Sequence, residues 1–184
     1  MKELPERKQN RLQNYDYSQN GAYFVTICAK NHAKLFGEIV GVHSVRRLPD
    51  CPSHAALSDE PVGAAFCRPQ LSEIGKIVES EIHRLSHTYA GVFVDYHIVM
   101  PNHVHMIIAL LNENGRQNAA PTLSRVIGQW KRAASIRAGY PIWQKSFHDH
   151  VIRNEQDYID IAEYIENNPA NWERDRFFMV TNPS

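Results

Sequence analysis

Hydrophobic and polar residues alternate with two different periods along the chain, and these periods predict its secondary structure. The segment Gly21 to Cys28 follows a Ser-Gln-Asn-Gly turn signal and is rich in β-branched and aromatic residues, which predicts a mostly buried strand. Apolar alternation from Leu35 to Val42 predicts a second strand. Because the two segments are close in the chain, we expect them to pair as an antiparallel hairpin.

The middle of the chain contains one helical pattern and two further strand patterns. Ser72 is a suitable cap for a helix whose apolar residues recur at helical spacing. The strands are expected at Val92 to Val99 and His103 to Leu110, joined by a tight turn at Met100-Pro101-Asn102. We expect these two strands to be adjacent and antiparallel.

The last third of the chain predicts two helices around one strand. A helix is expected from Thr122 to about Arg137, a strand within Ile142 to Ile152, and a final helix from Asn154 to Asn168, which Pro169 ends. The first of these helices has an apolar inner side and a cationic outer side. The inner residues are Leu123, Val126, Ile127, Trp130 and Ala134, and the outer ones are Arg125, Gln129, Lys131 and Arg132.

The element order ββαββαβα indicates the α+β class, with an antiparallel sheet and helices packed on it. At 184 residues and 43% hydrophobic residues, we expect one domain spanning 1–184. Residues 43–70 contain four prolines and little periodicity, which predicts a long loop or insertion. A short C-terminal tail is expected after residue 169.

Composition favours a soluble, cytoplasmic protein with no membrane partner. No apolar run approaches the roughly 20 residues that a membrane-spanning helix needs. The three cysteines, Cys28, Cys51 and Cys67, are odd in number and widely spaced, which favours reduced thiols.

Charge is unevenly distributed although the formal net charge is zero. Residues 120–153 contain six cations and one anion, whereas residues 154–184 contain seven acids and two arginines. A net charge of zero argues against a protein that coats duplex DNA through bulk electrostatic attraction. The basic segment nevertheless allows a local anion-binding surface.

Two short motifs contain candidate chemical groups. His103 and His105 are two apart on an expected strand, so both imidazoles project to one face and can bind the same cation. Such a pair, taken alone, is more often structural. Tyr164 and Asn168 are four apart and share one side of the last helix, although a boundary tyrosine and a C-terminal cap would give the same pattern.

In combination these motifs resemble the REP-associated tyrosine transposases, a group of single-tyrosine HUH transposases. The resemblance spans nearly the whole chain in the same order. The segments that carry it are Gly21-Ala22-Tyr23-Phe24-Val25-Thr26-Ile27, Leu35-Phe36-Gly37, Tyr96-His97-Ile98-Val99-Met100-Pro101-Asn102-His103-Val104-His105, Ile152-Arg153-Asn154 and Tyr164-Ile165-Glu166-Asn167-Asn168-Pro169. The insertion at 43–70 departs from compact relatives, in which this region is a short hairpin return.

The resemblance implies a ferredoxin-like HUH endonuclease fold and a strand-transfer reaction on single-stranded or hairpin DNA. It implies that His103, His105 and Asn168 bind Mg²⁺ or Mn²⁺. Tyr164 would then attack the DNA and form a 5′-phosphotyrosine intermediate. The resemblance allows either a monomer or a homodimer. It does not specify the target DNA sequence, or whether the protein moves a mobile element or serves a domesticated role in its host.

Several residues are candidates for contact with DNA. The polar ones are Arg125, Lys131, Arg132, Lys145, His150 and Arg153. Trp130, Trp143 and Phe147 could stack on bases, with core packing as an equally good alternative. His148 and His150 form a second His-x-His pattern, which we treat as secondary.

Three other functions remain open at this point. One is a non-cleaving regulator that binds hairpin DNA and derives from a transposase. A nucleotide hydrolase of the HIT type would need a third alternating histidine, where this chain has Ile107. A structural metal site is least favoured, because such sites usually have four protein ligands and favour cysteine.

Overall fold

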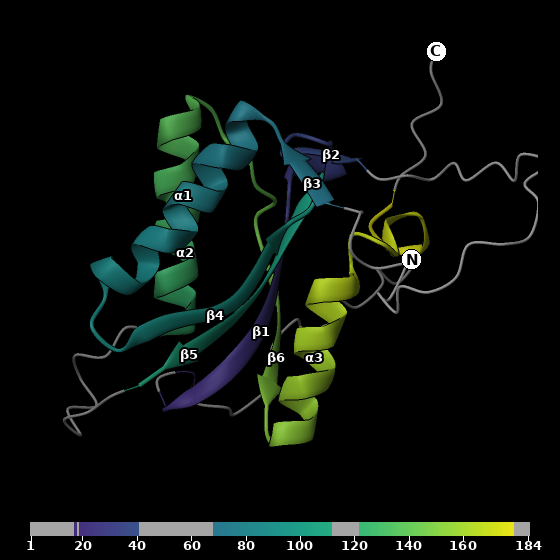
Figure 1. Cartoon of the computed structure of the whole chain (residues 1–184). Helices are drawn as coiled ribbons and strands as arrows, with labels where there is room; N and C mark the ends of the chain where they lie inside the picture. Colours follow the sequence, from purple (N-terminus) through teal and green to yellow (C-terminus); the bar gives the residue numbers. More distant parts are fainter. Residues whose placement is uncertain (1–16, 18, 41–67, 112–121, 179–184) are drawn as a thin grey trace, which may run out of the picture.

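A four-stranded antiparallel sheet forms the centre of the protein (Figure 1). The computed structural model describes residues 17, 19–40, 68–111 and 122–178. The sheet contains β1 (Gly21–Cys28), β4 (Val92–Val99), β5 (His103–Leu110) and β6 (His148–Ile152), in the order β4-β5-β1-β6. This arrangement of two interleaved strand-helix-strand units is ferredoxin-like, so the expected α+β class is confirmed.

Helices cover both faces of this sheet. α1 (Glu73–Thr88) and α2 (Leu123–Ala138) lie on one face, and α3 (Glu155–Asn167) lies on the other (Figure 1). All three begin after a cap residue, whose side chain accepts a hydrogen bond from a backbone N–H of the first turn. These caps are Ser72, Thr122 and Asn154. None of the helices in the described part of the chain is both long and apolar enough to cross a bilayer.

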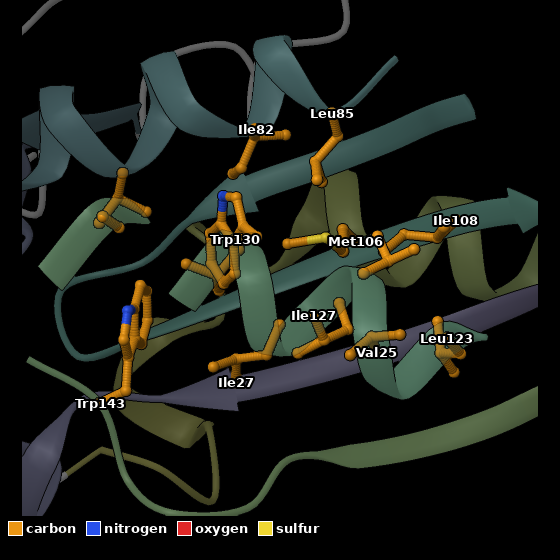
Figure 2. Close-up of a cluster of buried hydrophobic side chains, with 14 of the residues drawn as sticks. Val25, Ile27, Ile82, Leu85, Met106, Ile108, Leu123, Ile127, Trp130 and Trp143 are labelled. Atoms are coloured by element: carbon orange, nitrogen blue, oxygen red, sulfur yellow. The ribbon is translucent and has the colours of Figure 1, made fainter. Parts of the chain in front are cut away.

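The main hydrophobic core lies between the sheet and the α1/α2 layer (Figure 2). Alternate residues of β1 and β5 enter it, and Trp130 of α2 is among the largest buried side chains. Phe24, Thr26, His103 and His105 belong to the opposite set of alternate positions, which faces α3. In β1 and β5 the strand period therefore separates the positions that enter the main core from the positions that include His103 and His105.

A smaller core holds α3 on that second face. Ile107 of β5 packs with Ala162 and Ile165 of α3, and these three side chains are buried. They fix α3 over the sheet, so that its last turn lies at the end of β5 where the histidines are.

The prediction that the first two strands pair as a hairpin is wrong. β2 (Gly37–Val40) pairs with β3 (Arg68–Leu71) in a separate two-stranded sheet, because β1 is already paired with β5 and β6. Hydrophobic alternation identifies a strand but does not identify its partner. Gly37 has φ of 146°, and a Cβ there would collide with the carbonyl oxygen of Gln70, so this pairing requires glycine.

Two boundaries also differ from expectation. Residues 68–70, expected in the loop, belong to β3, which adds one strand to the expected order; residues 41–67 lie outside the described residues. The last strand begins at His148 rather than near Ile142, and Trp143 forms only an isolated bridge with Ala29. Of the three cysteines, Cys28 is buried and free, whereas Cys51 and Cys67 lie outside the described residues.

Candidate metal and nucleophile site

The two histidines of β5 point their Nε2 atoms at each other. His103 and His105 are the first and third residues of the strand and are almost completely buried. Their Nε2 atoms are 2.9 Å apart. At this distance the two nitrogens either share one proton or direct both lone pairs to one cation.

The outer nitrogen of each ring has a polar partner that fixes its orientation. Nδ1 of His103 lies 2.9 Å from Oδ1 of Asn102, and because an amide oxygen only accepts, this nitrogen is the donor. Nε2 of neutral His103 is therefore free to act as a ligand. Nδ1 of His105 lies 2.9 Å from the hydroxyl of Thr26, which can donate or accept and so permits either tautomer.

Both rings favour the neutral state. Burial lowers the pKa of His103 to about 4, although the nearby Asp175 carboxylate partly opposes this effect. Burial and the neighbouring His103 lower the pKa of His105 well below its ordinary range. Neutral imidazole is the form that binds metal, so both rings are ready ligands near pH 7.

The last turn of α3 brings the expected tyrosine to this pair. The phenol oxygen of Tyr164 is 3.4 Å from Nε2 of His105 and 3.4 Å from Oδ2 of Asp175. The ring of Tyr164 also makes an edge contact with Phe24 of β1. Because the side chain is 42% exposed, an external phosphate can approach the phenol.

Asn168 has a buried acceptor with no donor. Its side chain is 2% exposed, and its amide nitrogen donates to Oδ2 of Asp175 over 2.9 Å. Its Oδ1 is buried and has no hydrogen-bond partner among the described residues. An unpaired buried acceptor is costly, and a cation would satisfy it. Two imidazole nitrogens and an amide oxygen therefore fit a divalent ion, and Asp175 offers an oxygen in the same cluster.

Burial and the Asp175 carboxylate raise the pKa of Tyr164 above its ordinary range. Arg176 opposes this effect with its positive charge. Without a bound cation the phenol is therefore a weaker nucleophile than free tyrosine.

The segment that follows α3 closes over the histidines. The ring centroids of Trp172 and Phe177 are 5.9 and 4.8 Å from that of His103. The backbone oxygen of Phe177 accepts a hydrogen bond of 2.8 Å from the side-chain amide nitrogen of Asn102. The sequence predicted only a tail here, but this segment supplies one wall of the site.

Sequence reasoning missed Thr26, Asn102, Asp175 and Arg176 as members of the site. Thr26 carried a signal, because it is a polar residue at an inward position of an apolar strand. Asn102 was identified only as a turn residue. Asp175 and Arg176 carried no local signal, since only the fold of the C-terminal segment brings them beside Tyr164.

Three of the expected DNA-contacting residues belong to α2, on the sheet face opposite α3 (Figure 1). Arg125 and Arg132 are exposed there. The ammonium of Lys131 is instead held by backbone oxygens, the nearest being that of Gln144 at 2.6 Å. Lys131 thus stabilises the connection between α2 and β6.

The other residues expected to contact DNA lie just before, within or just after β6. Lys145 and Arg153 are exposed, and His150 forms an ion-pair contact of 3.0 Å with Asp157. His148 pairs with Thr26, which also pairs with His105, so the second His-x-His faces the same side of the sheet as the first.

The two tryptophans proposed for base stacking instead pack in the hydrophobic core. Trp130 and Trp143 are buried in the main core, at 2% and 8% exposure (Figure 2). Phe147 is partly buried against the same core.

Comparison with known proteins identifies the fold. No family model matches the chain. An uncharacterised protein of Haemophilus influenzae is 27% identical over 196 residues, covering 96% of this chain and 95% of the relative. A transposase candidate from Deinococcus radiodurans has a TM-score of 0.44 and 13% identity, covering 85% of this chain and 95% of that one.

A stronger structural match is a REP-associated tyrosine transposase solved with a bound REP hairpin. Its TM-score is 0.53 at 17% sequence identity, covering 92% of this chain and 74% of that one. The ferredoxin-like sheet with helices on both faces is therefore the fold of a known tyrosine transposase.

Proposed function

We propose that this chain is a tyrosine transposase that nicks and rejoins single-stranded DNA. The observation that carries the proposal is the convergence of the Tyr164 phenol, two neutral imidazoles and the unpaired Asn168 oxygen. These groups come from a central strand and from the end of α3, so tertiary structure brings them together. The shared fold with a solved tyrosine transposase supports the same assignment.

Nε2 of His103, Nε2 of His105 and Oδ1 of Asn168 are the proposed ligands for Mg²⁺ or Mn²⁺. When bound, such an ion would polarise a phosphate oxygen and favour the ionised phenol. Thr26 and Asn102 orient the imidazoles through their outer nitrogens. Mn²⁺ is the better first probe, since it accepts both imidazole and oxygen ligands.

Tyr164 supplies the nucleophile in this proposal. Its phenol oxygen forms a bond to phosphorus while the bond to the 3′ oxygen of the preceding nucleotide breaks. The phenol proton passes to the carboxylate of Asp175, which lies within 3.4 Å, and the leaving 3′ oxygen takes a proton from water. The products are a 5′-phosphotyrosine and a free 3′-hydroxyl, and attack by another 3′-hydroxyl reverses the chemistry.

A cation beside the site can attract the phosphate. Arg176 is exposed and lowers the pKa of both histidines and of Tyr164, so its positive charge acts on all three groups. It also stacks over Phe177, with the guanidinium carbon 4.6 Å from the ring centroid. Arg176 is thus positioned to bind DNA at the entrance to the site.

We infer that the substrate is single-stranded DNA that folds into hairpins. The solved transposase with this fold was bound to a REP hairpin. His150 and Arg153 are candidates for contact with DNA on the α3 side of the sheet, and Lys145 lies just before β6.

The direct test is to incubate the purified protein with Mn²⁺ and a pool of single-stranded hairpin DNAs. A protein–DNA adduct that survives denaturation, and that a chelator prevents, is the expected result. Sequencing the captured DNA would then identify the target.

A non-cleaving hairpin-binding regulator is the second candidate, because Trp172 and Phe177 close over the histidines. That function predicts hairpin binding with no adduct in any divalent metal. The same experiment therefore separates the two candidates.

A further inference from the structure

A second cluster of metal-binding side chains lies on the opposite face of the sheet. Glu79 and His83 are four apart on α1 and so share one side of the helix. His97 of β4 pairs with Met106, a core residue beneath α1 and α2, whereas its neighbour Ile98 pairs with His105. His97 therefore faces α1, and the sheet separates it from the first histidine pair.

The three side chains are close enough to bind one ion. One donor atom from each of Glu79, His83 and His97 lies within 4.8 Å of the other two. The two imidazole rings have centroids 5.1 Å apart and are nearly perpendicular, at 86°. Donors around a tetrahedral ion with bonds of about 2.0–2.1 Å are roughly 3.4 Å apart, so the side chains would have to move together by about 1.4 Å at most to bind one ion.

The residue types select the class of metal. Two imidazoles and one carboxylate favour zinc and similar transition metals over Mg²⁺ or Ca²⁺, which prefer oxygen. Burial and the neighbouring His83 lower the pKa of His97, although the Glu79 carboxylate partly opposes this effect, and the result favours the neutral, metal-binding imidazole. Within the described residues, none of these three side chains makes a hydrogen bond or an ion pair that would otherwise explain the cluster.

We propose that Glu79, His83 and His97 form a second metal site, for Zn²⁺ or a similar transition-metal ion, that ties α1 to the edge strand β4. Three protein ligands leave a position for water, so the site is open rather than closed. A bound ion links a helix to a strand that is paired on one side only, and therefore stabilises this edge of the fold. This site is independent of the proposed DNA chemistry.

The test uses the full-length chain with Co²⁺ as a spectroscopic probe and Zn²⁺ as its competitor. A His105→Ala background removes a ligand of the first site, so that the remaining binding reports on the second. We expect one equivalent of Co²⁺, displaced by Zn²⁺, and a rise in Tm of about 5–10 °C at a Zn²⁺ concentration of about 100 Kd.

Adding His83→Ala or Glu79→Gln to this background should weaken Co²⁺ binding by at least tenfold and abolish the rise in Tm. His83 is exposed, so its replacement should not prevent folding. His87→Ala, which removes an exposed histidine one turn further along α1, is the matched control and should change neither measurement. Absence of a bound equivalent in the background protein, or full binding after His83→Ala, would overturn the proposal.

Discussion

The phenol oxygen of Tyr164 lies 3.4 Å from Nε2 of His105, although the two residues are 59 positions apart in the chain. β5 supplies the imidazole and α3 supplies the phenol, and the packing of Ile107 against Ile165 fixes one element on the other.

Replacing Tyr164 with phenylalanine should abolish the covalent adduct and leave affinity for hairpin DNA within about twofold. The substitution removes one oxygen from a partly exposed side chain, so the fold should not change. Gel analysis of the denatured adduct and a separate binding titration measure the two effects. Tyr158→Phe, on the same helix, is the control and should still form the adduct.

Replacing Thr26 with valine should weaken Mn²⁺ binding about 10–100-fold, because the outer nitrogen of His105 loses its hydroxyl partner. Valine has nearly the same shape, so packing should be largely retained. Calorimetric titration with Mn²⁺ measures the effect. Thr88→Val changes an exposed hydroxyl on α1 and should leave Mn²⁺ affinity as it is; equal affinities in both variants would remove Thr26 from the site.

The metal-free protein should lose stability as the pH falls from about 6.5 to about 4. The pKa of His103 is lowered to about 4 in the folded state, so the unfolded chain binds more protons over this interval. His103 alone should therefore lower the free energy of unfolding by about 3 kcal/mol on acidification, and His105, whose pKa is also lowered, should add to this loss. Denaturant titrations in chelator across this pH range measure the slope.

His103→Gln should flatten that slope even if it lowers stability at every pH. An unchanged slope in this variant would mean that another group causes the pH dependence.

Replacing Phe177 with alanine should lower Tm and increase the rate of DNA cleavage severalfold. Its ring packs beside His103 and His32, so the truncation removes buried apolar contacts. It also uncovers the histidines, which reduces the cost of opening the site. Single-turnover kinetics would reveal the change, and a cleavage rate that falls with the lost stability would show that Phe177 supports the site instead of closing it.

The sequence revealed those parts of the fold that depend on local pattern. The cap at Ser72 and the helix starts at Thr122 and Asn154 were predicted because helix starts depend on residue type and spacing. The partner of β2 was predicted wrongly because alternation contains no information about which strand lies alongside.

The candidate site likewise contains residues that the sequence predicted and residues that it did not. His103, His105, Tyr164 and Asn168 belong to two short motifs that could be read directly from the chain, and the structure brings them together. Asp175 reaches Tyr164 and Asn168 only through the path of the segment after α3, and no local pattern indicates that path. The buried role of Trp130 was left open because an aromatic at helical spacing fits both a core and a stacking surface.

The most direct test of the central claim is to identify the amino acid that carries DNA in the adduct. The protein is incubated with Mn²⁺ and a cleavable single-stranded hairpin, the DNA is trimmed with nuclease, and the modified peptide is sequenced by mass spectrometry. The account predicts a nucleotide attached through its 5′ phosphate to Tyr164. A nucleotide on another residue, or hairpin binding without an adduct, would contradict it.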